Sequence, residues 1–280
     1  MKENKKLQIN GTMLEKEQLK KHLEKIASSH NITNKSQKDT YPVPELIKDY
    51  EKIKEVYQML NQHVGIKINI HPAGEWLLDN FYIIEETVKQ IQKELTLKKY
   101  TNFVGIANGE YAGYARIYVL ASEIVAYTEN KIEKENLEEY LQSYQNKKTL
   151  SMDEIWNIGT FIQIAIIHNI SQISEKIASN QAQKYKVESI TERIVEGKTR
   201  QEQIYKEYKE NTHNFNKTML KDMRYPFIEY MSYTLKRYGK KGTRYLKALE
   251  EIVEKTRNDS IRSNTKRTLW CSNTKSTNGK

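Results

Sequence analysis

The sequence lacks the features that would place it outside the cell or in a membrane. It has one cysteine, Cys271, which excludes an internal disulfide framework and is typical of a reducing compartment. No apolar segment follows the lysines at the N-terminus, so no secretory signal is visible. The most apolar stretch, residues 155–170, is interrupted by Asn157, Gln163 and His168 and is shorter than the roughly 20 apolar residues that cross a bilayer. These absences predict a cytoplasmic location.

Helix-breaking residues are also scarce. The chain has 4 Pro and 11 Gly among 280 residues rich in Lys, Glu, Ile and Leu. Because Pro and Gly disfavour helix interiors, this composition predicts helices joined by short turns. Tyrosine is unusually common, with 19 Tyr against 5 Phe, and it suits half-buried helix contacts whose hydroxyl groups stay hydrated. We therefore expect an all-α fold, an irregular multi-helix bundle.

The positive charge is concentrated at the C-terminus. The chain has 46 Lys and Arg against 36 Asp and Glu, a net charge of +10. Residues 257–280 hold six basic residues and one acidic residue, which is half of the excess. Elsewhere the two signs are interleaved as on ordinary helix surfaces, and no nucleic-acid-binding motif is present. A nucleic-acid binder is thus an alternative that the sequence disfavours, and its affinity would fall steeply with salt.

The composition divides the chain into three parts. Residues 1–40 are expected to form a flexible N-terminal arm with one short helix at 12–28 and a polar linker after it. Residues 41–256 are expected to form the helical bundle domain. Residues 257–280 are rich in Ser, Thr, Asn and Lys, which predicts a disordered basic tail.

Two capping boxes indicate where helices begin. In this pattern a Ser or Thr is followed three residues later by a Glu, and the two side chains satisfy backbone N–H groups that the helix leaves free. Thr12 and Glu15 have this spacing at the start of the arm helix. Ser151 and Glu154 have it at the start of a long apolar segment, which predicts a central helix to about Ala182.

Apolar residues recur at steps of three and four in several other segments, which predicts amphipathic helices. These segments are 44–62, 74–95, 114–127, 137–144, 187–196, 200–210, 217–238 and 245–253. The stretches between them include an extended connector at 66–70, a glycine-containing loop at 101–113 and a turn at 239–242.

The predicted helix at 74–95 has the widest apolar face. Its main stripe consists of Leu77, Phe81, Ile84, Val88 and Ile91. Trp76, Leu78 and Ile83 widen this stripe, so we expect other helices to cover it from more than one side. Asn80 lies at the margin of the buried face and needs a hydrogen-bond partner there, whereas Asp79 points away from it.

Catalytic and metal-binding patterns are mostly missing. A di-iron site in a helical bundle needs two Glu-x-x-His pairs, and this chain has one, Glu210 with His213. His168 lies on a buried face and is interpreted as a hydrogen-bonded core histidine rather than a general base. Cys271 has no companion motif, and the glycine-containing loop lacks a phosphate-binding signature. We therefore expect no metal ion and no cofactor.

Several aromatic residues could contact a sugar ring. They are Trp76, Tyr82, Tyr111, Tyr114 and Tyr118. Stacking on a sugar is one interpretation, but aromatic residues at helical spacing pack more often in a core or an interface.

Four ordered blocks of the chain carry a family resemblance. The most specific is Trp-Leu-Leu-Asp-Asn-Phe at 76–81, and the others lie at 112–118, 123–128 and 150–156. These blocks resemble the N-terminal region of the cyclic β-1,2-glucan synthase family. Its members are multidomain membrane enzymes that polymerise glucose from UDP-glucose, with catalytic domains C-terminal to this region. The resemblance therefore implies no catalytic residue in this chain.

We expect the chain to be a truncated N-terminal helical region of a cyclic β-1,2-glucan synthase-like protein, inactive alone, that scaffolds or docks against the transferase domain. A frameshift near Arg257 is our hypothesis for the truncation, because the next reading frame, back-translated with A/T-rich codons, resembles the family's continuation. Candidate contacts with glucan or with another domain are Trp76, Asp79, Asn80, Tyr114, Arg116 and Tyr118. The alternative is a free-standing α-helical protein-interaction module.

Overall fold

The computed structural model describes residues 7, 9, 11–65, 69–195, 230–247 and 250. The chain divides into two units, residues 1–178 and 179–280, which we describe separately. Regular structure in the described residues is almost entirely helical, with two strands of two residues each, so the predicted all-α fold is confirmed.

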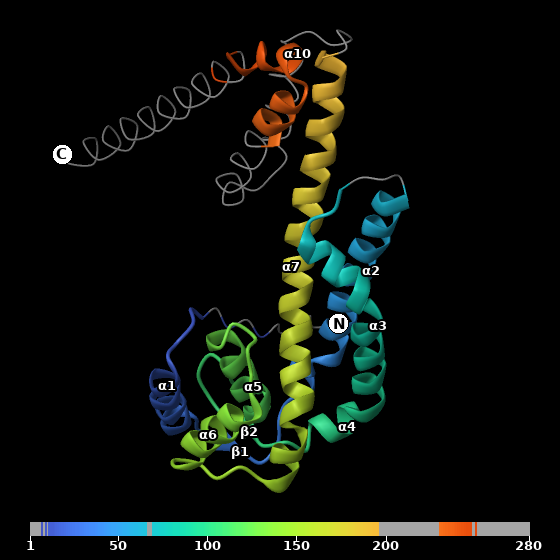
Figure 1. The fold of residues 1–280 in the computed structure, drawn as a ribbon. Coiled ribbons are helices and arrows are strands. Elements are labelled where there is room, and N and C mark those ends of the chain that lie inside the picture. Colours follow the sequence, from blue (N-terminus) through green and yellow to red (C-terminus); the bar gives the residue numbers. More distant parts are fainter. Residues whose placement is uncertain are drawn as a thin grey trace, which may run out of the picture. The chain divides into compact units, whose positions relative to one another are not determined.

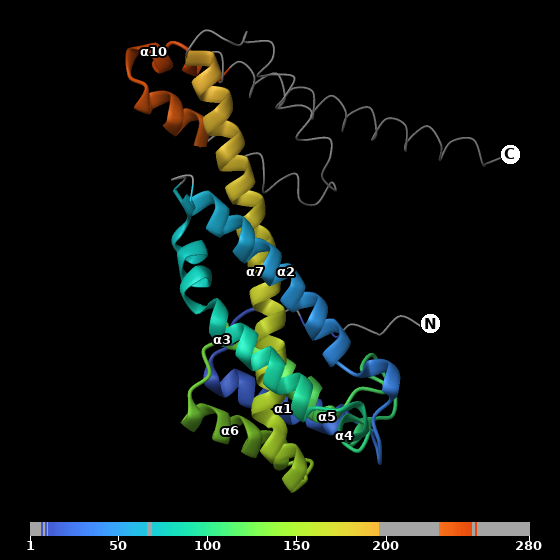
Figure 2. The same ribbon diagram turned by 90° about the vertical axis from the view of Figure 1, so that its right-hand side faces the viewer.

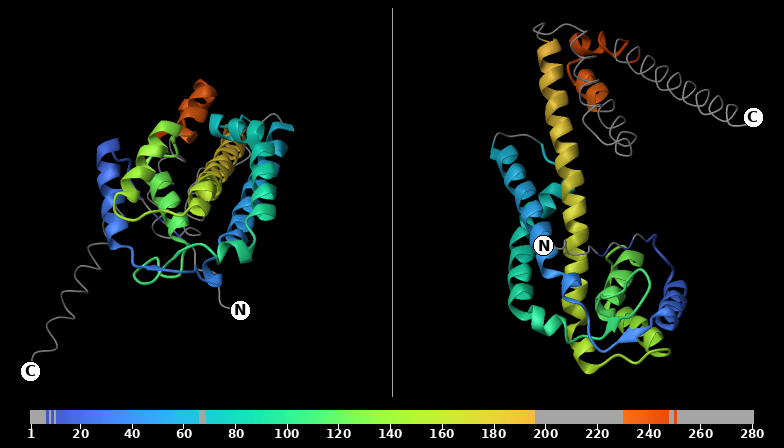
Figure 3. Two further views of the ribbon diagram at one scale, coloured as in Figure 1. Left: turned by 90° about the horizontal axis from the view of Figure 1, so that it is seen from below. Right: turned by 180° about the vertical axis from the view of Figure 1, so that it is seen from behind.

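In the first unit, two groups of helices pack on the N-terminal part of α7. The elements in chain order are α1 (Lys16–Ser29), β1 (Ile32–Thr33), the 3₁₀ helix η1 (Lys38–Thr40), α2 (Val43–Gly65), α3 (Pro72–Glu94), α4 (Leu97–Tyr100), β2 (Gly105–Ile106), α5 (Arg116–Tyr127), α6 (Lys134–Gln145) and α7 (Met152–Val195). The α2–α3 pair lies on one side of α7, and α1, α5 and α6 lie on the other (Figure 1). The view from below in Figure 3 shows the same order. Helices α2 and α3 run side by side (Figure 2).

The described part of the N-terminal segment is packed, so the expectation of a flexible arm is wrong there. Leu19, Leu23 and Ala27 of α1 are fully buried, and α1 packs against α6 and α5. The apolar stripe of α1 is thin, and from the sequence this predicted a helix that packs only loosely on the rest of the protein. Partner helices more than a hundred residues away cover that stripe, and sequence periodicity does not report such partners.

The helix in this segment also begins later than predicted. Glu15 is the N-cap residue and Gln18 completes the capping box, with the Glu15 N–H donating to Gln18 Oε1 at 3.3 Å. The predicted pair of Thr12 and Glu15 is therefore not used. The sequence pattern requires Ser or Thr at the first position, so it selected Thr12 and gave no sign that the Glu15 side chain takes this place.

The polar stretch after α1 is ordered by hydrogen bonds to Tyr100. The Ser36 hydroxyl donates to the Tyr100 carbonyl at 2.7 Å, and the Thr40 hydroxyl lies 3.0 Å from the Tyr100 hydroxyl. All three residues are buried. Ser36 and Thr40 therefore attach this largely exposed stretch to the core, because their small polar side chains find buried partners, and the stretch is not a free linker.

Helices α2 and α3 confirm the predicted segments to within a few residues. His71 caps α3 by accepting a hydrogen bond from the Ala73 N–H at 3.2 Å. Leu77, Ile84, Val88 and Ile91 form its buried face. The expected covering from more than one side is wrong for Trp76, which is 52% exposed, and for Ile83, which is also exposed. These two side chains lie outside the face that packs in the core.

Two short strands link the ends of α1 and α4. They pair in antiparallel orientation, with Thr33 opposite Gly105. A Cβ atom at Gly105 would lie 2.4 Å from the Lys35 carbonyl oxygen, so only glycine fits this approach. The sequence indicated a loop at 101–113, because strands of two residues leave no alternation to detect.

The second capping box is confirmed at the start of α7. The Ser151 hydroxyl accepts from the Glu154 N–H at 3.3 Å, and Glu154 Oε2 accepts from the Ser151 N–H at 2.8 Å. Helix α7 continues to Val195, so the separate helix predicted at 187–196 is instead its extension. Phe161, Ile164 and Ile167 are buried, as expected for a central helix.

In the second unit, residues 230–237 are helical and are followed by α10 (Lys240–Thr243). Gly239 has φ +55° and turns the chain between them, so the predicted turn at 239–242 is shorter than expected. The pair Glu210 and His213, Cys271 and the predicted tail lie outside the described residues, as do most of the predicted helices from 200 onward. The domain boundaries at residues 40 and 256 stay predictions.

Candidate functional site

A buried ion pair joins α5 to the first turn of α7. Arg116 Nε donates to Glu154 Oε1 at 2.7 Å, and Arg116 Nη2 donates to Glu154 Oε2 at 2.8 Å. The two side chains are 4% and 0% exposed. Nη2 also donates to the Thr149 carbonyl at 2.8 Å. Burial lowers the pKa of Arg116, but the hydrogen bond to Glu154, the Glu154 charge and Tyr144 together outweigh this effect and the pKa is raised, so the guanidinium stays charged.

A histidine and a tyrosine lie near this pair. His30, at the C-terminal end of α1, has its Nδ1 atom 3.0 Å from the Tyr144 hydroxyl of α6. Burial lowers the pKa of His30 to about 4, and the charges of Arg116 and Lys148 act in the same direction. Burial raises the pKa of Tyr144 to about 12. Both groups are therefore neutral at pH 7.

We call His30, Arg116, Tyr144 and Glu154 the buried polar junction. Its members come from four helices or helix ends, and each has a hydrogen-bond partner inside the protein. Buried polar groups that are paired in this way hold elements in place, whereas a general acid or base must reach a substrate. The arrangement favours a structural role.

The three candidate contact residues in α5 and just before it are buried. Tyr114, Arg116 and Tyr118 have little exposed surface. The Tyr118 ring lies 5.6 Å from the Phe161 ring, centroid to centroid, and Arg116 belongs to the buried polar junction. None of the three presents its side chain to solvent in this structure.

The three candidates on α3 lie at or near the surface. Trp76 and Asp79 are exposed, and Asn80 is half-buried. The Asn80 amide donates to the Trp76 carbonyl at 2.8 Å, so it finds its partner within its own helix. The six predicted residues therefore do not form one site: one group is in the core and the other faces water.

His168 of α7 pairs with Asp49 of α2. Its Nδ1 atom lies 2.7 Å from Asp49 Oδ2, and its Nε2 atom lies 2.8 Å from Gln172 Nε2. With the carboxylate as acceptor, Nδ1 donates, and Nε2 accepts from the glutamine amide. The interpretation of His168 as a hydrogen-bonded core histidine is confirmed.

A small cavity lies beside this pair. Its volume is about 20 Å³, and its lining includes Thr40, Asp49, Tyr118 and His168. That volume holds about one water molecule, whereas pockets for nucleotides or sugars measure several hundred Å³. The cavity is too small to bind a sugar nucleotide as it stands.

Sequence reasoning also missed a third buried acidic residue, Glu123 of α5. Its Oε2 atom lies 3.0 Å from His22 Nε2, and its side chain is nearly inaccessible. Burial raises the pKa of Glu123, although the bond to His22 opposes this shift. The available signal was one acidic residue on an otherwise apolar helix face, which requires a buried partner.

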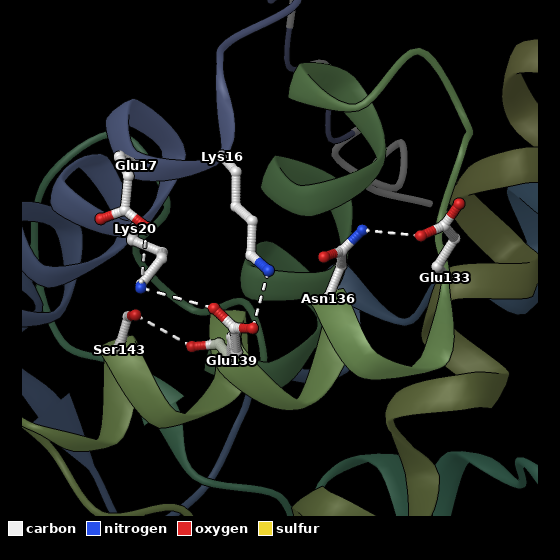
Figure 4. Close-up of polar contacts among 7 residues, drawn as sticks. All are labelled: Lys16, Glu17, Lys20, Glu133, Asn136, Glu139 and Ser143. Atoms are coloured by element: carbon white, nitrogen blue, oxygen red, sulfur yellow. Dashed lines mark hydrogen bonds and ion pairs between the residues drawn. The ribbon is translucent and has the colours of Figure 1, made fainter.

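Exposed charges also join α1 to α6 (Figure 4). Lys16 Nζ lies 2.7 Å from Glu139 Oε1, and Lys20 Nζ lies 3.4 Å from Glu139 Oε2 and 3.0 Å from Glu17 Oε1. Because these groups are in contact with water and salt, such pairs contribute little to stability.

Two exposed apolar surfaces remain. Met152 and Trp156 lie one turn apart at the start of α7, and Trp156 is 73% exposed; we call this pair the α7 apolar surface. Trp76 and Ile83, two turns apart on α3, form the α3 apolar surface. Sequence reasoning did not single out Trp156, because the helix around it is apolar on nearly every side.

Across residues 11–65, 69–195 and 230–247, no group of three His, Cys, Asp or Glu side chains could hold a metal ion. Within the same part of the chain, every helix is too short or too polar to cross a bilayer. The absence of a cofactor and the cytoplasmic location stay predictions.

The chain matches no protein-family model. It is similar to the cyclic β-(1,2)-glucan synthase NdvB of Rhizobium meliloti (strain 1021), with 22% identity over 145 residues. The similar segment makes up 52% of this chain but 5% of the synthase, so the chain spans about a twentieth of that relative. This weak similarity supports a distant family relationship and agrees with the resemblance of the four sequence blocks.

Proposed function

We propose that this chain is a helical docking region related to the cyclic β-1,2-glucan synthases. It acts beside a glycosyltransferase domain that uses UDP-glucose and turns over no substrate itself. The observation that carries this proposal is the similarity to a synthase of which the chain covers 5%. A segment that matches so small a fraction of the synthase is consistent with an accessory part of a multidomain enzyme.

The buried polar groups support an accessory role. In the buried polar junction and in the Asp49–His168 pair, the side chains with catalytic potential bond to each other and close the gaps between helices. The adjacent cavity of about 20 Å³ is far smaller than a sugar nucleotide requires. These groups stabilise the position of α5 and α7 rather than face a substrate.

The α7 apolar surface is the proposed docking contact. Trp is the residue type most enriched among the side chains that dominate binding energy in protein interfaces, and Met adapts to irregular partner surfaces. Isolated exposed apolar residues are ordinary, but Met152 and Trp156 lie together on one helix face. We still propose that the α3 apolar surface, together with Asp79, contacts glucan or another domain.

The test begins with the DNA beyond codon 256. A reading frame that continues the synthase family there would supply the missing polypeptide, which is then purified. UDP-glucose consumption is measured for this chain, for that polypeptide and for their mixture. We expect no turnover by the chain alone and a higher rate for the mixture than for the second polypeptide. Trp156→Ala should lower this gain.

Ile173→Ala is the matched control, because Ile173 is an exposed apolar residue of the same helix, α7, outside both apolar surfaces. Turnover by the isolated chain would contradict the accessory role. An equal loss with Ile173→Ala would contradict docking through Met152 and Trp156. If no continuing frame exists, the truncation is excluded and the free-standing protein-interaction module becomes the better description.

A further inference from the structure

Residues 230–247 form the most basic part of the described chain. This segment has six Lys and Arg residues and no Asp or Glu. Of the 46 basic and 36 acidic residues in the chain, six basic and one acidic lie in 257–280 and six further basic residues lie in 230–247, which leaves 34 basic against 35 acidic in the rest. The positive charge outside the C-terminal 24 residues therefore comes from this one segment, which the sequence analysis had treated as ordinary helix surface.

All six cations of the segment are exposed. They are Lys236, Arg237, Lys240, Lys241, Arg244 and Lys247. No ion pair within the described part of the chain involves any of them. Their charge is therefore available to an external anion. We call these residues the basic segment.

The backbone of this segment is held in a tight turn. Gly239 has φ +55°, which favours glycine, and it ends the helical residues 230–237. A Cβ atom at Gly242 would lie 2.0 Å from the Leu235 carbonyl oxygen, so α10 packs directly on the preceding helix. Met231 and Leu235 are buried. The cations thus extend from a compact turn rather than from a free chain.

Aromatic side chains lie among the cations. Tyr233 and Tyr238 are exposed, and the Arg244 guanidinium lies 4.8 Å from the centre of the Tyr245 ring. Exposed Tyr beside Lys and Arg is the composition found at membrane interfaces, where the ring enters the headgroup layer and the cations pair with phosphate.

We propose that the basic segment binds the surface of an anionic lipid bilayer through the phosphate groups of its lipids. This inference is independent of the proposed docking function. A double-stranded nucleic acid fits less well, because α10 has four residues and is too short to read a major groove. A single-stranded one is bound in a groove lined with successive aromatic platforms, whereas the cations here lie on the helical residues 230–237, on α10 and just after it.

The test uses the full chain and vesicles in a sedimentation assay. Vesicles of phosphatidylcholine with about 30% phosphatidylserine should bind the protein, and vesicles of phosphatidylcholine alone should not. Binding should fall strongly as salt rises from about 0.1 M to about 0.5 M, because screening shortens the range of the attraction. The double variant Lys240→Gln with Lys241→Gln should lower the partition coefficient between vesicles and water about 30-fold. Each cation near the surface contributes a factor of about five, and the two factors multiply.

Lys98→Gln with Lys99→Gln is the matched control, because these are also two consecutive exposed lysines in a four-residue helix, α4. It removes the same net charge from the first unit and should leave binding within about twofold of the unaltered chain, because the proposal assigns the lipid contact to the basic segment alone. Circular dichroism checks that both double variants stay folded. Equal losses in the two variants would show a net-charge effect and overturn the proposal. Tight binding to single-stranded RNA with none to the anionic vesicles would overturn it as well.

Discussion

Arg116 and Glu154 lie 38 residues apart in sequence and form two hydrogen bonds, at 2.7 and 2.8 Å, inside the protein. Glu154 also completes the capping box of α7 with Ser151. The Glu154 carboxylate therefore caps the N-terminal end of α7 and also attaches this end to α5. The start of α7 is consequently fixed in the first unit.

Glu154→Gln should lower the free energy of unfolding by about 3 to 5 kcal/mol, because it leaves the Arg116 guanidinium buried without a countercharge. Glutamine still supports a capping box, so the variant removes the charge and keeps the cap. Urea unfolding followed by circular dichroism measures the loss. Glu139→Gln, which removes an exposed partner of Lys16 and Lys20, is the control and should cause a much smaller change. Similar losses in both variants would refute the special role of the buried pair.

His30 should make stability fall in mild acid. Its folded pKa is lowered to about 4 from an ordinary value near 6.5, so the unfolded chain takes up a proton in this window and the folded chain does not. The stabilising contribution is complete above pH 6.5 and is lost as pH falls toward 4. Its size is about 2 to 3 kcal/mol. Unfolding in urea at several pH values should show a smaller acid loss for His30→Gln than for the unaltered chain; equal slopes would exclude His30 as the source.

Gly105→Ala and Gly159→Ala should change stability in opposite directions. A Cβ at Gly105 would lie 2.4 Å from a backbone oxygen, and the clash should cost about 1 to 3 kcal/mol. A Cβ at Gly159 meets nothing within 4 Å, and alanine favours the helix by about 0.5 to 1 kcal/mol. Thermal unfolding of the two variants compares them directly. A stable Gly105→Ala protein would mean that β1 and β2 do not approach as described.

Phe161→Ala and Trp156→Ala separate the core of α7 from its proposed docking surface. Phe161 is fully buried, with its ring centre 5.4 Å from that of Phe103 and 5.6 Å from that of Tyr118, so its removal should cost about 3 to 5 kcal/mol. Trp156 is 73% exposed and its removal should cost less than about 0.5 kcal/mol. Denaturant titration gives both values. A large loss for Trp156→Ala would mean that it packs within the chain and is not a free contact surface.

Most helices could be predicted from the sequence. The segments of α2, α3, α5 and α6 and the start of α7 follow from apolar residues at steps of three and four and from the Ser151 capping box. The packed segment before residue 40 could not be predicted. Its burial depends on contacts with residues such as Tyr100, 60 or more positions later, and local composition does not contain that information.

The candidate contact residues show the same limit. Periodicity placed Trp76 and Tyr118 in helices, but it did not show that Trp76 faces water and Tyr118 faces the core. Trp156 was placed in the right helix and its exposure was missed. A helix that is apolar on nearly every side gives no sequence signal for the side that stays uncovered.

The sequence by itself determined that the described part of this protein is helical, approximately where α2, α3, α5 and α6 lie and where α7 begins, and which distant family its blocks resemble, because helix periodicity, caps and residue strings are local properties. Only the tertiary structure decided which polar groups meet. The pairing of Arg116 with Glu154, of His30 with Tyr144 and of Glu123 with His22 depends on chain segments brought together from far apart. The physical reason is that a buried charge or imidazole is tolerated only where folding supplies its partner.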